Sequence, residues 1–512
     1  MQNPFRSSVS ESAQVGPCIV VIFGATGDLT HRKLVPALYN LSVDGLLPAN
    51  FHTIGVARRD MPAEKFREGL GKAIRDFSRR KEINESVWSE LSTHTHYVNC
   101  PFDSLEHYTG LREKIESLEM ESGMKANRLF YLATSPDYFE VISHNLAASG
   151  LLDQSNGVAA RVIVEKPFGH DLATAKELNT RLLGCMKEEQ IFRIDHYLGK
   201  ETVQNLLVFR FSNGFFEPIW NYKYIDHVEI SVCESIGVGG RAGYFDSSGI
   251  LRDIVQNHAL QLLCLVGLEP PVAFEADAVR DEKVKVLRSV RRIPIDRVSG
   301  SVVRGRYQSG AVDGKEVPGY LAEAGVDPAS TTETYVALQF AIDNWRWAGV
   351  PFFVRAGKRV AKRVTEISVH FKKVPHLLFR DQSSGSWSSN VLSFRIQPDE
   401  GISFKISAKP PGPKVQVQSV NMDFSYGSSF GIEAPEAYER LLLDAMKGDA
   451  TLFTRNDEIE QAWDLLENVF AAWRGDHGIS PPPVYGYEAG SWGPNAAEEL
   501  LVKKIGQGWR RL

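Results

Sequence analysis

The run Ile19-Val-Val-Ile-Phe23, followed directly by Gly24-Ala-Thr-Gly-Asp-Leu29, decides how the chain folds. Five consecutive apolar residues, most of them β-branched, are typical of a strand buried on both faces of a parallel sheet. The glycines allow a tight turn, and Leu34, Leu38 and Leu41 predict a helix after it. A strand, a glycine turn and a helix form the context in which backbone N–H groups bind a pyrophosphate, although the pattern is not a full G-x-G-x-x-G.

The same rhythm continues through the first part of the chain, where short apolar runs alternate with longer amphipathic stretches such as Ala63 to Arg80. This alternation predicts strand-helix-strand units. The expected strands are Cys18 to Phe23, Thr53 to Ala57, His96 to Cys100, Leu129 to Ala133, Val162 to Glu165 and Ile191 to Ile194. We therefore predict a Rossmann-like, doubly wound parallel sheet over residues 17–198, preceded by a flexible arm of residues 1–16.

Beyond Lys200 the pattern changes. A helix is expected over Gly249 to Val266, and helical patterns recur from Ala437 to Lys447 and from Asp457 to Trp473. The expected strands are Glu333 to Ile342, Phe352 to Arg355, Glu366 to Phe371, Leu392 to Gln397 and Ile402 to Ala408. Because little helical sequence separates these strands, residues 199–512 are predicted to form an α+β domain with a large, mainly antiparallel sheet and helices.

Bulk properties limit the classes of function. A chain of 512 residues exceeds one ordinary hydrophobic core, and a net charge of −5 argues against a nucleic-acid partner. The five cysteines are scattered without metal-type pairing, which indicates a reducing cytoplasm and no metal site. No apolar run approaches the roughly 20 residues of a membrane span, so no membrane partner is expected.

The glycine loop has two interpretations, a turn that merely caps a strand and a cofactor site. Its position after the first strand favours the cofactor, because open parallel sheets bind ligands at the carboxyl ends of their strands. The expected cofactor residues are Gly24, Ala25, Thr26, Gly27, Asp28 and Leu29. At the end of the second strand, Arg58 and Arg59 favour the 2′-phosphate of NADP, although one arginine could simply cover the next helix. Asp60 follows them, so NAD remains a weaker alternative.

Two further runs follow predicted strands at the same sheet edge. In Glu165-Lys-Pro-Phe-Gly169, the proline restricts Lys166 to extended geometry, and Pro167 could be cis. The second run is Arg193-Ile-Asp-His-Tyr-Leu-Gly-Lys200. It supplies three donors suited to a phosphate dianion and, beside them, the carboxylate of Asp195. A lone histidine or lysine would normally be a solvated surface group, but four such groups within six residues favour a phosphate site.

A histidine further along the chain is a candidate base. Arg252 to His258 lies in the predicted helix, where Asp253 and His258 are five residues apart and so off one tight stripe. A buried, hydrogen-bonded core histidine is the plainer interpretation. A dehydrogenase, however, needs a base with a pKa near the operating pH to take a hydroxyl proton as hydride leaves. The sequence does not show whether His258 lies beside Asp195.

Together, the runs at Gly24 to Leu29, Glu165 to Gly169, Arg193 to Lys200 and Arg252 to His258 resemble the glucose-6-phosphate dehydrogenase family, over nearly the whole chain. The resemblance implies oxidation of β-D-glucose 6-phosphate at C1 to 6-phosphoglucono-1,5-lactone, with hydride transfer to NADP. This reaction is the first step of the oxidative pentose phosphate pathway. The resemblance also implies a homodimer or homotetramer, and hence substrate binding and oligomerisation by residues 199–512.

The resemblance implies a role for each matching residue. His258 corresponds to the general base and Asp195 to its carboxylate partner. The residues expected to bind glucose 6-phosphate are Lys166, His196, Tyr197, Lys200, Glu234, Asp253, Lys358, Arg363 and Gln397. Among them, Lys166 is also expected to reach the cofactor. Arg363 stands where some relatives carry lysine, which keeps the charge but changes its geometry.

Two other functions are consistent with parts of this sequence. An oxidoreductase of free sugars, similar to glucose-fructose oxidoreductase, also carries a Glu-Lys-Pro run but does not need the phosphate cluster. A noncatalytic redox sensor or scaffold that binds NADP would keep the glycine loop and Arg58 but would not need His258. The presence of all the expected chemical groups favours the dehydrogenase.

Overall fold

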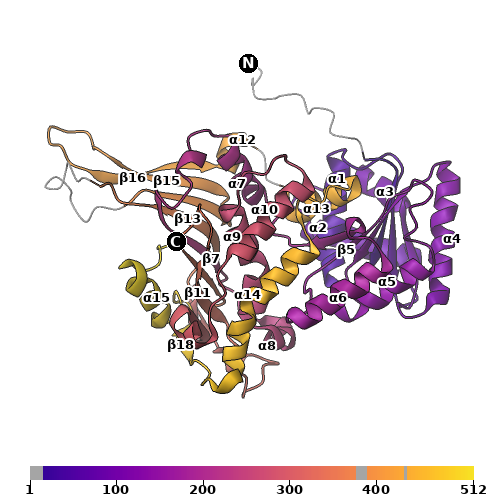
Figure 1. Cartoon of the computed structure of the whole chain (residues 1–512). Helices are drawn as coiled ribbons and strands as arrows, with labels where there is room; N and C mark the ends of the chain where they lie inside the picture. Colours follow the sequence, from indigo (N-terminus) through magenta and orange to yellow (C-terminus); the bar gives the residue numbers. More distant parts are fainter. Residues whose placement is uncertain (1–14, 376–388, 432–434) are drawn as a thin grey trace.

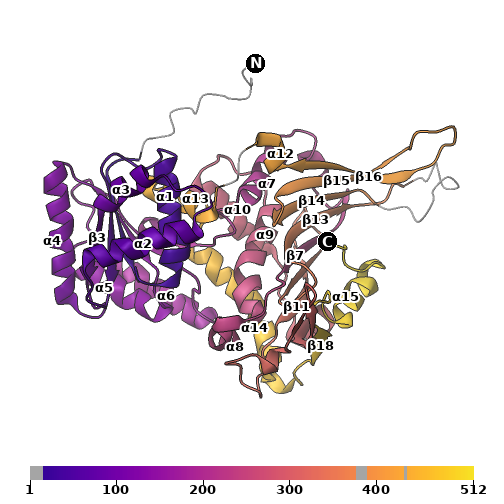
Figure 2. The same cartoon turned by 180° about the vertical axis from the view of Figure 1, so that it is seen from behind.

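The computed structural model describes residues 15–375, 389–431 and 435–512. Of the expected arm at residues 1–16, all but Val15 and Gly16 lie outside the described residues. Two large sheets organise the protein, and helices lie between them in both views (Figures 1 and 2).

The first sheet confirms the predicted doubly wound arrangement. Its strands are β1 (Cys18–Phe23), β2 (Phe51–Ala57), β3 (Thr95–Asn99), β4 (Asn127–Leu132), β5 (Ala160–Val164), β6 (Ile191–Ile194) and β17 (Phe453–Thr454). The order is β17-β6-β5-β4-β1-β2-β3, and strands β1 to β6 pair in parallel. The chain order reverses between β1 and β4, the point at which such sheets bind ligands. β17 pairs antiparallel with β6 and was not predicted, because two residues show no periodicity.

Helices cover both faces of this sheet. They are the π-helix η1 (Thr30–Leu34) and the α-helices α1 (Val35–Val43), α2 (Ala63–Phe77), α3 (Glu85–Thr93), α4 (Leu105–Ser122), α5 (Phe139–Ala148) and α6 (Leu172–Cys185). The helix predicted to run to Arg80 ends at Phe77. Ser78 turns extended because its hydroxyl donates to Asn40, while Arg79 pairs with Glu439. Tertiary contacts therefore end this helix before its local sequence does.

The second sheet is mainly antiparallel, as predicted. Its strands are β7 (Ile225–Cys233), β8 (Val302–Gln308), β11 (Tyr335–Ala341), β12 (Pro351–Gly357), β13 (Val364–Phe371), β14 (Val391–Gln397), β15 (Gly401–Ala408), β16 (Gln418–Ser425) and β18 (Val484–Glu488). Their order is β16-β15-β14-β13-β7-β12-β11-β8-β18, with parallel pairs only at β7–β12 and β8–β18. The sequence prediction found β11 to β15 but missed the other four, including the central strand β7. A separate hairpin joins β9 (Gly310–Val312) and β10 (Lys315–Val317).

In place of the single helix predicted from Gly249 to Val266, the structure has three consecutive helical segments. It comprises α8 (Ala242–Ile250), the π-helix η6 (Leu251–Ala259) and α9 (Leu260–Gly267). Gly249 takes a φ of +69°, and the backbone then turns into η6. In a π-helix hydrogen bonds run from i to i+5, so residues five apart approach one face. The expectation that Asp253 and His258 lie off one tight stripe was therefore wrong, because apolar periodicity does not distinguish a π-turn from an α-turn.

The end of the chain returns to the first sheet. The remaining α-helices are α7 (Glu201–Phe211), α10 (Ala276–Ser289), α11 (Val298–Ser301), α12 (Tyr426–Phe430), α13 (Ala437–Lys447), α14 (Asn456–Arg474) and α15 (Asn495–Ile505). Helices α13 and α14 match the two helices that the sequence predicted in this part of the chain. Helix α13 packs on α1, and α14 packs on α6 and α10 (Figure 1). The buried Glu439 of α13 accepts hydrogen bonds from Asn40 and Arg79. The two halves are thus held together by the last part of the chain.

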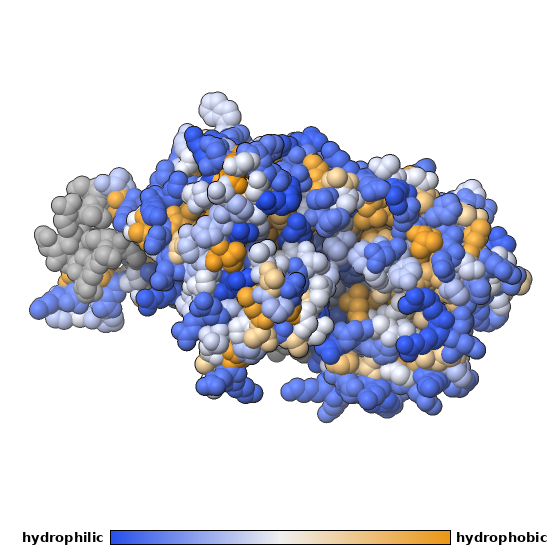
Figure 3. All heavy atoms as spheres, turned by 90° about the horizontal axis from the view of Figure 1, so that it is seen from below, coloured by the Kyte–Doolittle hydropathy of each residue, from blue (hydrophilic) through white to orange (hydrophobic). Residues whose placement is uncertain are grey.

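Hydrophilic side chains cover much of the outer surface. On the face shown in Figure 3, apolar side chains among the described residues lie scattered between hydrophilic ones. No helix of the described ranges is long and apolar enough to cross a bilayer.

The geometry of the glycine loop predicts unequal effects of alanine at two positive-φ positions. Gly24 has a φ of +82°, and a Cβ there would lie against the carbonyl oxygen of Ala133, inside van der Waals contact. Gly45 has a φ of +67° with open space around it. Gly45→Ala should cost about 1–2 kcal/mol for backbone strain alone. Gly24→Ala should cost about 1–3 kcal/mol more because of overpacking, measured as the free energy of unfolding in urea. Equal losses would contradict this prediction.

Candidate active site

A cavity of about 290 Å³ lies where the carboxyl edge of the first sheet meets η6 and the second sheet. It is lined by nine of the eleven residues that were nominated for catalysis and substrate binding, all except Asp195 and Lys200. These are Lys166, His196, Tyr197, Glu234, Asp253, His258, Lys358, Arg363 and Gln397. Segments as distant as β5 and β14 therefore converge on one small, polar space.

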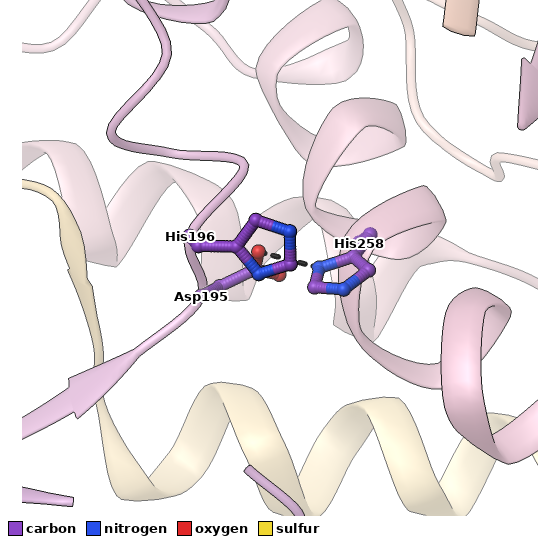
Figure 4. A group of neighbouring side chains, drawn as sticks. All are labelled: Asp195, His196 and His258. Atoms are coloured by element: carbon purple, nitrogen blue, oxygen red, sulfur yellow. Dashed lines mark hydrogen bonds and ion pairs between the residues drawn. The ribbon is translucent and has the colours of Figure 1, made fainter. Parts of the chain in front are cut away.

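The centre of the site is a contact between two buried residues. His258 Nδ1 lies 2.5 Å from Asp195 Oδ1, and the two side chains are 1% and 2% exposed. Asp195 follows β6 and His258 lies on η6, and Figure 4 shows the two side chains pointing toward each other. The sequence alone did not bring these two residues together.

Burial and charge set the protonation of the pair. Burial lowers the pKa of His258 below its ordinary value, although the Asp195 carboxylate opposes the shift. Burial raises the pKa of Asp195, but the charge and hydrogen bond of His258 outweigh it and bring that pKa to about 2. At neutral pH the pair is therefore a carboxylate that accepts the Nδ1–H of a neutral imidazole, which leaves the Nε2 lone pair free to take a proton.

Aromatic rings hold the plane of the imidazole. The ring of Tyr197 stacks on His258 with centroids 4.2 Å apart, and His196 meets His258 edge-on at 4.6 Å. Figure 4 shows His196 leaving the same loop as Asp195. Because both rings come from the run at residues 193–200, the segment that supplies the carboxylate also orients the base.

Lys166 contacts the other side of His258. Its Nζ lies 3.2 Å from His258 Nε2 and donates to the backbone and side-chain oxygens of Asp253 at 2.8 and 3.2 Å. Burial lowers the pKa of Lys166, but the charges of Asp253 and Asp195 and the hydrogen bond to Asp253 outweigh it and raise that pKa overall. Lys166 is therefore an ammonium group whose proton faces the lone pair of the base. The Lys166–Pro167 bond is cis, one of the two isomers that the sequence left open.

One end of the cavity is positively charged. Lys200 lies behind Gln397, to which its Nζ donates at 2.6 Å, and above the ring of Tyr197. Burial lowers the pKa of Lys200 to about 8, with Glu400 opposing the shift and Arg363 adding to it. Among the described residues, neither Lys200 nor Arg363 has a carboxylate within ion-pair distance. This end is suited to an anion.

The neighbouring His196 and Tyr197 are uncharged hydrogen-bonding groups. Burial, with His258 nearby, holds the pKa of His196 well below its ordinary value. The Tyr197 hydroxyl lies 3.4 Å from the side chains of both Thr365 and Gln397. These side chains supply directional hydrogen-bond donors beside the charged groups of Lys200 and Arg363.

The other end of the cavity carries two carboxylates. Lys358 Nζ donates to Glu234 at 2.5 Å and lies 3.8 Å from Asp253. Burial raises the pKa of Asp253, but Lys166 and Lys358 outweigh it and hold that pKa well below its ordinary value. Glu234 follows β7 and Lys358 follows β12, so adjacent strands supply the pair. Carboxylates accept hydrogen bonds and the ammonium group of Lys358 donates them, so this end of the cavity suits a ligand rich in hydroxyl groups, which do both.

The glycine loop lies further along the same sheet edge, after β1. Gly24 N–H and Ala25 N–H both donate to Val56, and Gly27 N–H donates to Gly24, which closes a tight turn. A side chain at Gly24 would fill the space beside Ala133. This close backbone approach fits a dinucleotide pyrophosphate at the helix that follows, and it leaves Lys166, after β5, between the loop and the cavity.

Arg58 lies at the end of β2, as predicted. Its guanidinium donates to the Tyr138 hydroxyl at 2.9 Å and lies over the rings of Tyr138 and Phe102. These contacts turn the guanidinium toward the reversal between β1 and β4. Arg58 and the glycine loop are thus neighbours, and they stand apart from the cavity residues.

Sequence reasoning missed the two other lining residues with polar side chains. Arg241 and Tyr244 line the cavity, and the Arg241 guanidinium lies over the Tyr244 ring. Arg241 follows Gly239 and Gly240 at the entry to α8. The sequence signal that could have indicated these residues was the glycine pair before an arginine at the start of a helix. Such a pair has no periodicity, so it looks like an ordinary loop.

Comparisons with known proteins agree over the whole chain. The family model described as glucose-6-phosphate dehydrogenase, NAD binding domain, matches residues 21–205, and that of the C-terminal domain matches residues 207–510. The chain is 48% identical over 499 residues to a glucose-6-phosphate 1-dehydrogenase of Chlamydia muridarum, covering 96% of this chain and 97% of the relative. It is 44% identical over 513 residues to glucose-6-phosphate 1-dehydrogenase 2 of Mycobacterium tuberculosis, covering 100% and 98%.

Solved structures of similar proteins share the complete fold. One is a glucose-6-phosphate dehydrogenase in complex with its substrate glucose-6-phosphate, with a TM-score of 0.88, 37% identity and coverage of 98% of this chain and 100% of that one. Another is the glucose-6-phosphate 1-dehydrogenase of Mycobacterium avium, with a TM-score of 0.82, 36% identity and coverage of 97% and 98%.

Proposed function

The chain belongs to the glucose-6-phosphate dehydrogenase family, and from that premise we propose how its residues divide the work of the reaction. The protein is an NADP-dependent glucose-6-phosphate 1-dehydrogenase, an oxidoreductase of carbohydrate metabolism. It oxidises β-D-glucose 6-phosphate at C1 to 6-phosphoglucono-1,5-lactone, the first step of the oxidative pentose phosphate pathway. The family therefore favours a sugar phosphate over the free sugars considered above.

His258 acts as the general base. Its Nε2 takes the proton of the C1 hydroxyl while the C1–H bond breaks, and the C1–O bond becomes the carbonyl of the lactone. NADP supplies the hydride acceptor. The observation that carries this assignment is the 2.5 Å contact between Asp195 and His258 Nδ1, because it leaves Nε2 as the proton acceptor at the cavity. Asp195 stabilises the imidazolium that forms, as carboxylates do in other histidine pairs.

Lys166 exchanges partners when substrate binds. Its ammonium group lies 3.2 Å from His258 Nε2, where the C1 hydroxyl must bind. We assign Lys166 to the oxygen of the sugar and to the cofactor, since it lies between the glycine loop and the cavity. Moving it frees the lone pair of His258 only when a substrate oxygen is present to accept the hydrogen bond.

The remaining residues recognise the two ends of the substrate. His196, Tyr197, Lys200 and Arg363 bind the 6-phosphate, because they form the end of the site without a carboxylate. Glu234 and Asp253, with Lys358 and Gln397, bind the sugar hydroxyls. Gly24, Ala25, Thr26, Gly27, Asp28, Leu29 and Arg58 hold the cofactor.

Domain limits, assembly and location extend this proposal. We assign residues 17–198 to NADP binding and residues 199–512 to substrate binding and oligomerisation. The edge strand β16 leaves Val420 and Met422 42% and 60% exposed, which fits pairing with another copy in a homodimer or homotetramer. All five cysteines are free, which fits a reducing cytoplasm.

Removing the base should stop turnover without preventing binding. We expect His258→Asn to lower kcat by about 10²–10⁴-fold with a nearly unchanged KM for glucose 6-phosphate, measured by NADPH absorbance. Asp195→Asn should also lower kcat, because an amide favours the wrong tautomer. The exposed His144 allows His144→Asn as a control, which should turn over normally. Near-normal turnover in His258→Asn would refute the assignment.

The pKa of Lys200 predicts how substrate affinity depends on pH. Lys200 is an ammonium group below its pKa of about 8 and a neutral amine above it, so phosphate binding weakens as pH rises. The KM for glucose 6-phosphate should rise roughly 10-fold or more well above pH 8, because a charged hydrogen bond is lost. The Lys200→Arg variant keeps its positive charge at high pH. Its KM for glucose 6-phosphate should be higher than that of the unchanged protein, because the geometry differs, but nearly independent of pH. A parallel rise in both proteins would exclude Lys200 as the cause.

Cofactor choice should depend on Arg58. We expect Arg58→Ala to raise the KM for NADP by roughly 10–100-fold, the effect of one charged hydrogen bond, while the KM for NAD changes little. Arg59→Ala is the matched control, since Arg59 is also exposed after β2. Equal changes in the two KM values would place the selectivity elsewhere.

A further inference from the structure

Glu165 is a carboxylate at the active-site edge of the first sheet to which the chemistry above gives no part. It follows β5 and directly precedes Lys166. Its Oε1 accepts hydrogen bonds from the hydroxyl groups of Tyr131 at 2.6 Å and Tyr438 at 3.2 Å. Among the residues that the structure describes, no lysine, arginine or histidine lies within ion-pair distance of Glu165. Two neutral phenol groups, rather than a cation, therefore hold this carboxylate.

Burial fixes the protonation of the two tyrosines. Tyr131 is 0% exposed, and burial and the charge of Glu165 hold its pKa well above the ordinary value. The same two causes hold the pKa of Tyr438 well above the ordinary value, so both hydroxyl groups are donors. Burial also raises the pKa of Glu165, although the two hydrogen bonds and the charge of Lys166 oppose that shift. If the carboxylate moved away, it would lose both hydrogen bonds in a buried place, which is costly.

Both tyrosines belong to elements that other contacts hold in place. Tyr131 lies on β4, which pairs with β1 on one side and with β5 on the other. Tyr438 lies in the first turn of α13, where the next residue, Glu439, accepts hydrogen bonds from Asn40 and Arg79. Neither tyrosine lines the catalytic cavity. The contacts that hold Glu165 therefore do not depend on a ligand in that cavity.

Lys166 needs such an anchor because its own contacts must change. Its Nζ contacts Asp253 and His258 of η6, and these contacts have to break before the C1 hydroxyl can reach His258 Nε2. Once they break, the side chain of Lys166 no longer ties its backbone to η6. Glu165, one residue earlier, remains bound to β4 and α13. The backbone can then stay in place while the ammonium group moves.

We propose that Tyr131 and Tyr438 are positioning residues, which hold Glu165 and thereby the backbone of Lys166 while the Lys166 ammonium group passes from His258 to the substrate. The role depends on the exchange of partners proposed above for Lys166. In this role neither tyrosine touches substrate or cofactor. Their hydroxyl groups restrict the movement of Lys166 to rotation of its side chain, and precise orientation of this kind contributes strongly to enzymatic rates.

Removal of the two hydroxyl groups tests the proposal. Tyr131→Phe and Tyr438→Phe should each lower kcat roughly 10–100-fold, since a displacement of about 1 Å near the chemistry has such a cost. The KM for glucose 6-phosphate should change little, because neither tyrosine lines the cavity. Tyr39→Phe is the matched control, since the buried Tyr39 hydroxyl also makes one hydrogen bond, from the backbone N–H of Asn84 at 2.7 Å. It should turn over normally, and the thermal midpoint shows that each variant folds.

Variants of Glu165 show whether the tyrosines act through this carboxylate. Glu165→Gln keeps an oxygen that accepts both hydroxyl groups, so it should retain more of kcat than Glu165→Ala. In the Glu165→Ala background, Tyr131→Phe and Tyr438→Phe should not lower kcat further, because the group that they hold is gone. Normal kcat in both single tyrosine variants would overturn the proposal.

The ring of Tyr438 also lies parallel to that of His196, with centroids 6.4 Å apart, which gives a second route to the phosphate end of the cavity. A further loss from Tyr438→Phe in the Glu165→Ala background, with a raised KM for glucose 6-phosphate, would assign Tyr438 to that end and overturn its role through Glu165. Lys166→Gln tests the exchange of partners by itself. Normal kcat in Lys166→Gln would overturn both the exchange and the anchor, whereas a lowered kcat there with normal tyrosine variants would overturn the anchor alone.

Discussion

The buried contact between Asp195 and His258 is the constraint on which the active site depends. Neither residue is useful alone, because an isolated buried carboxylate is costly and an unoriented imidazole has no defined tautomer. The contact requires β6 to end at Ile194 and η6 to pass the same point, although 63 residues separate the pair in sequence. The contact therefore ties η6 to the carboxyl end of β6, while α13 and α14 hold the two halves of the molecule together.

The π-helix provides what an α-helix could not. Lys166 contacts both Asp253 and His258, which are five residues apart and reach one side chain only because the turn is wider. The irregular segment is held at its start by Glu333, whose carbonyl and carboxylate accept hydrogen bonds from Ile250 and Leu251. A less favourable helix geometry is thus maintained by tertiary contacts at the place where the chemistry needs it.

The last part of the chain completes the molecule on both sides. β17 and α13 extend the first sheet and its helical layer, and Trp463 of α14 donates to the backbone of Phe168 just after Lys166. Further on, Arg510 covers the large sheet beside Glu229 and Glu366. One stretch of chain therefore fixes the loop that carries Lys166, while another closes the opposite face of the second sheet.

The sequence by itself determined the elements whose signals are local. Continuous apolar runs predicted β1 to β6, the glycine turn predicted the loop after β1, and four polar groups within residues 195–200 predicted an anion site. Tertiary structure alone decided what depends on distant partners. The approach of His258 to Asp195, the π-turn, the two-residue β17 and the contact of Tyr438 with Glu165 all follow from packing and sheet register. Local periodicity reports which face of an element is buried, but it contains no information about which other element will cover that face.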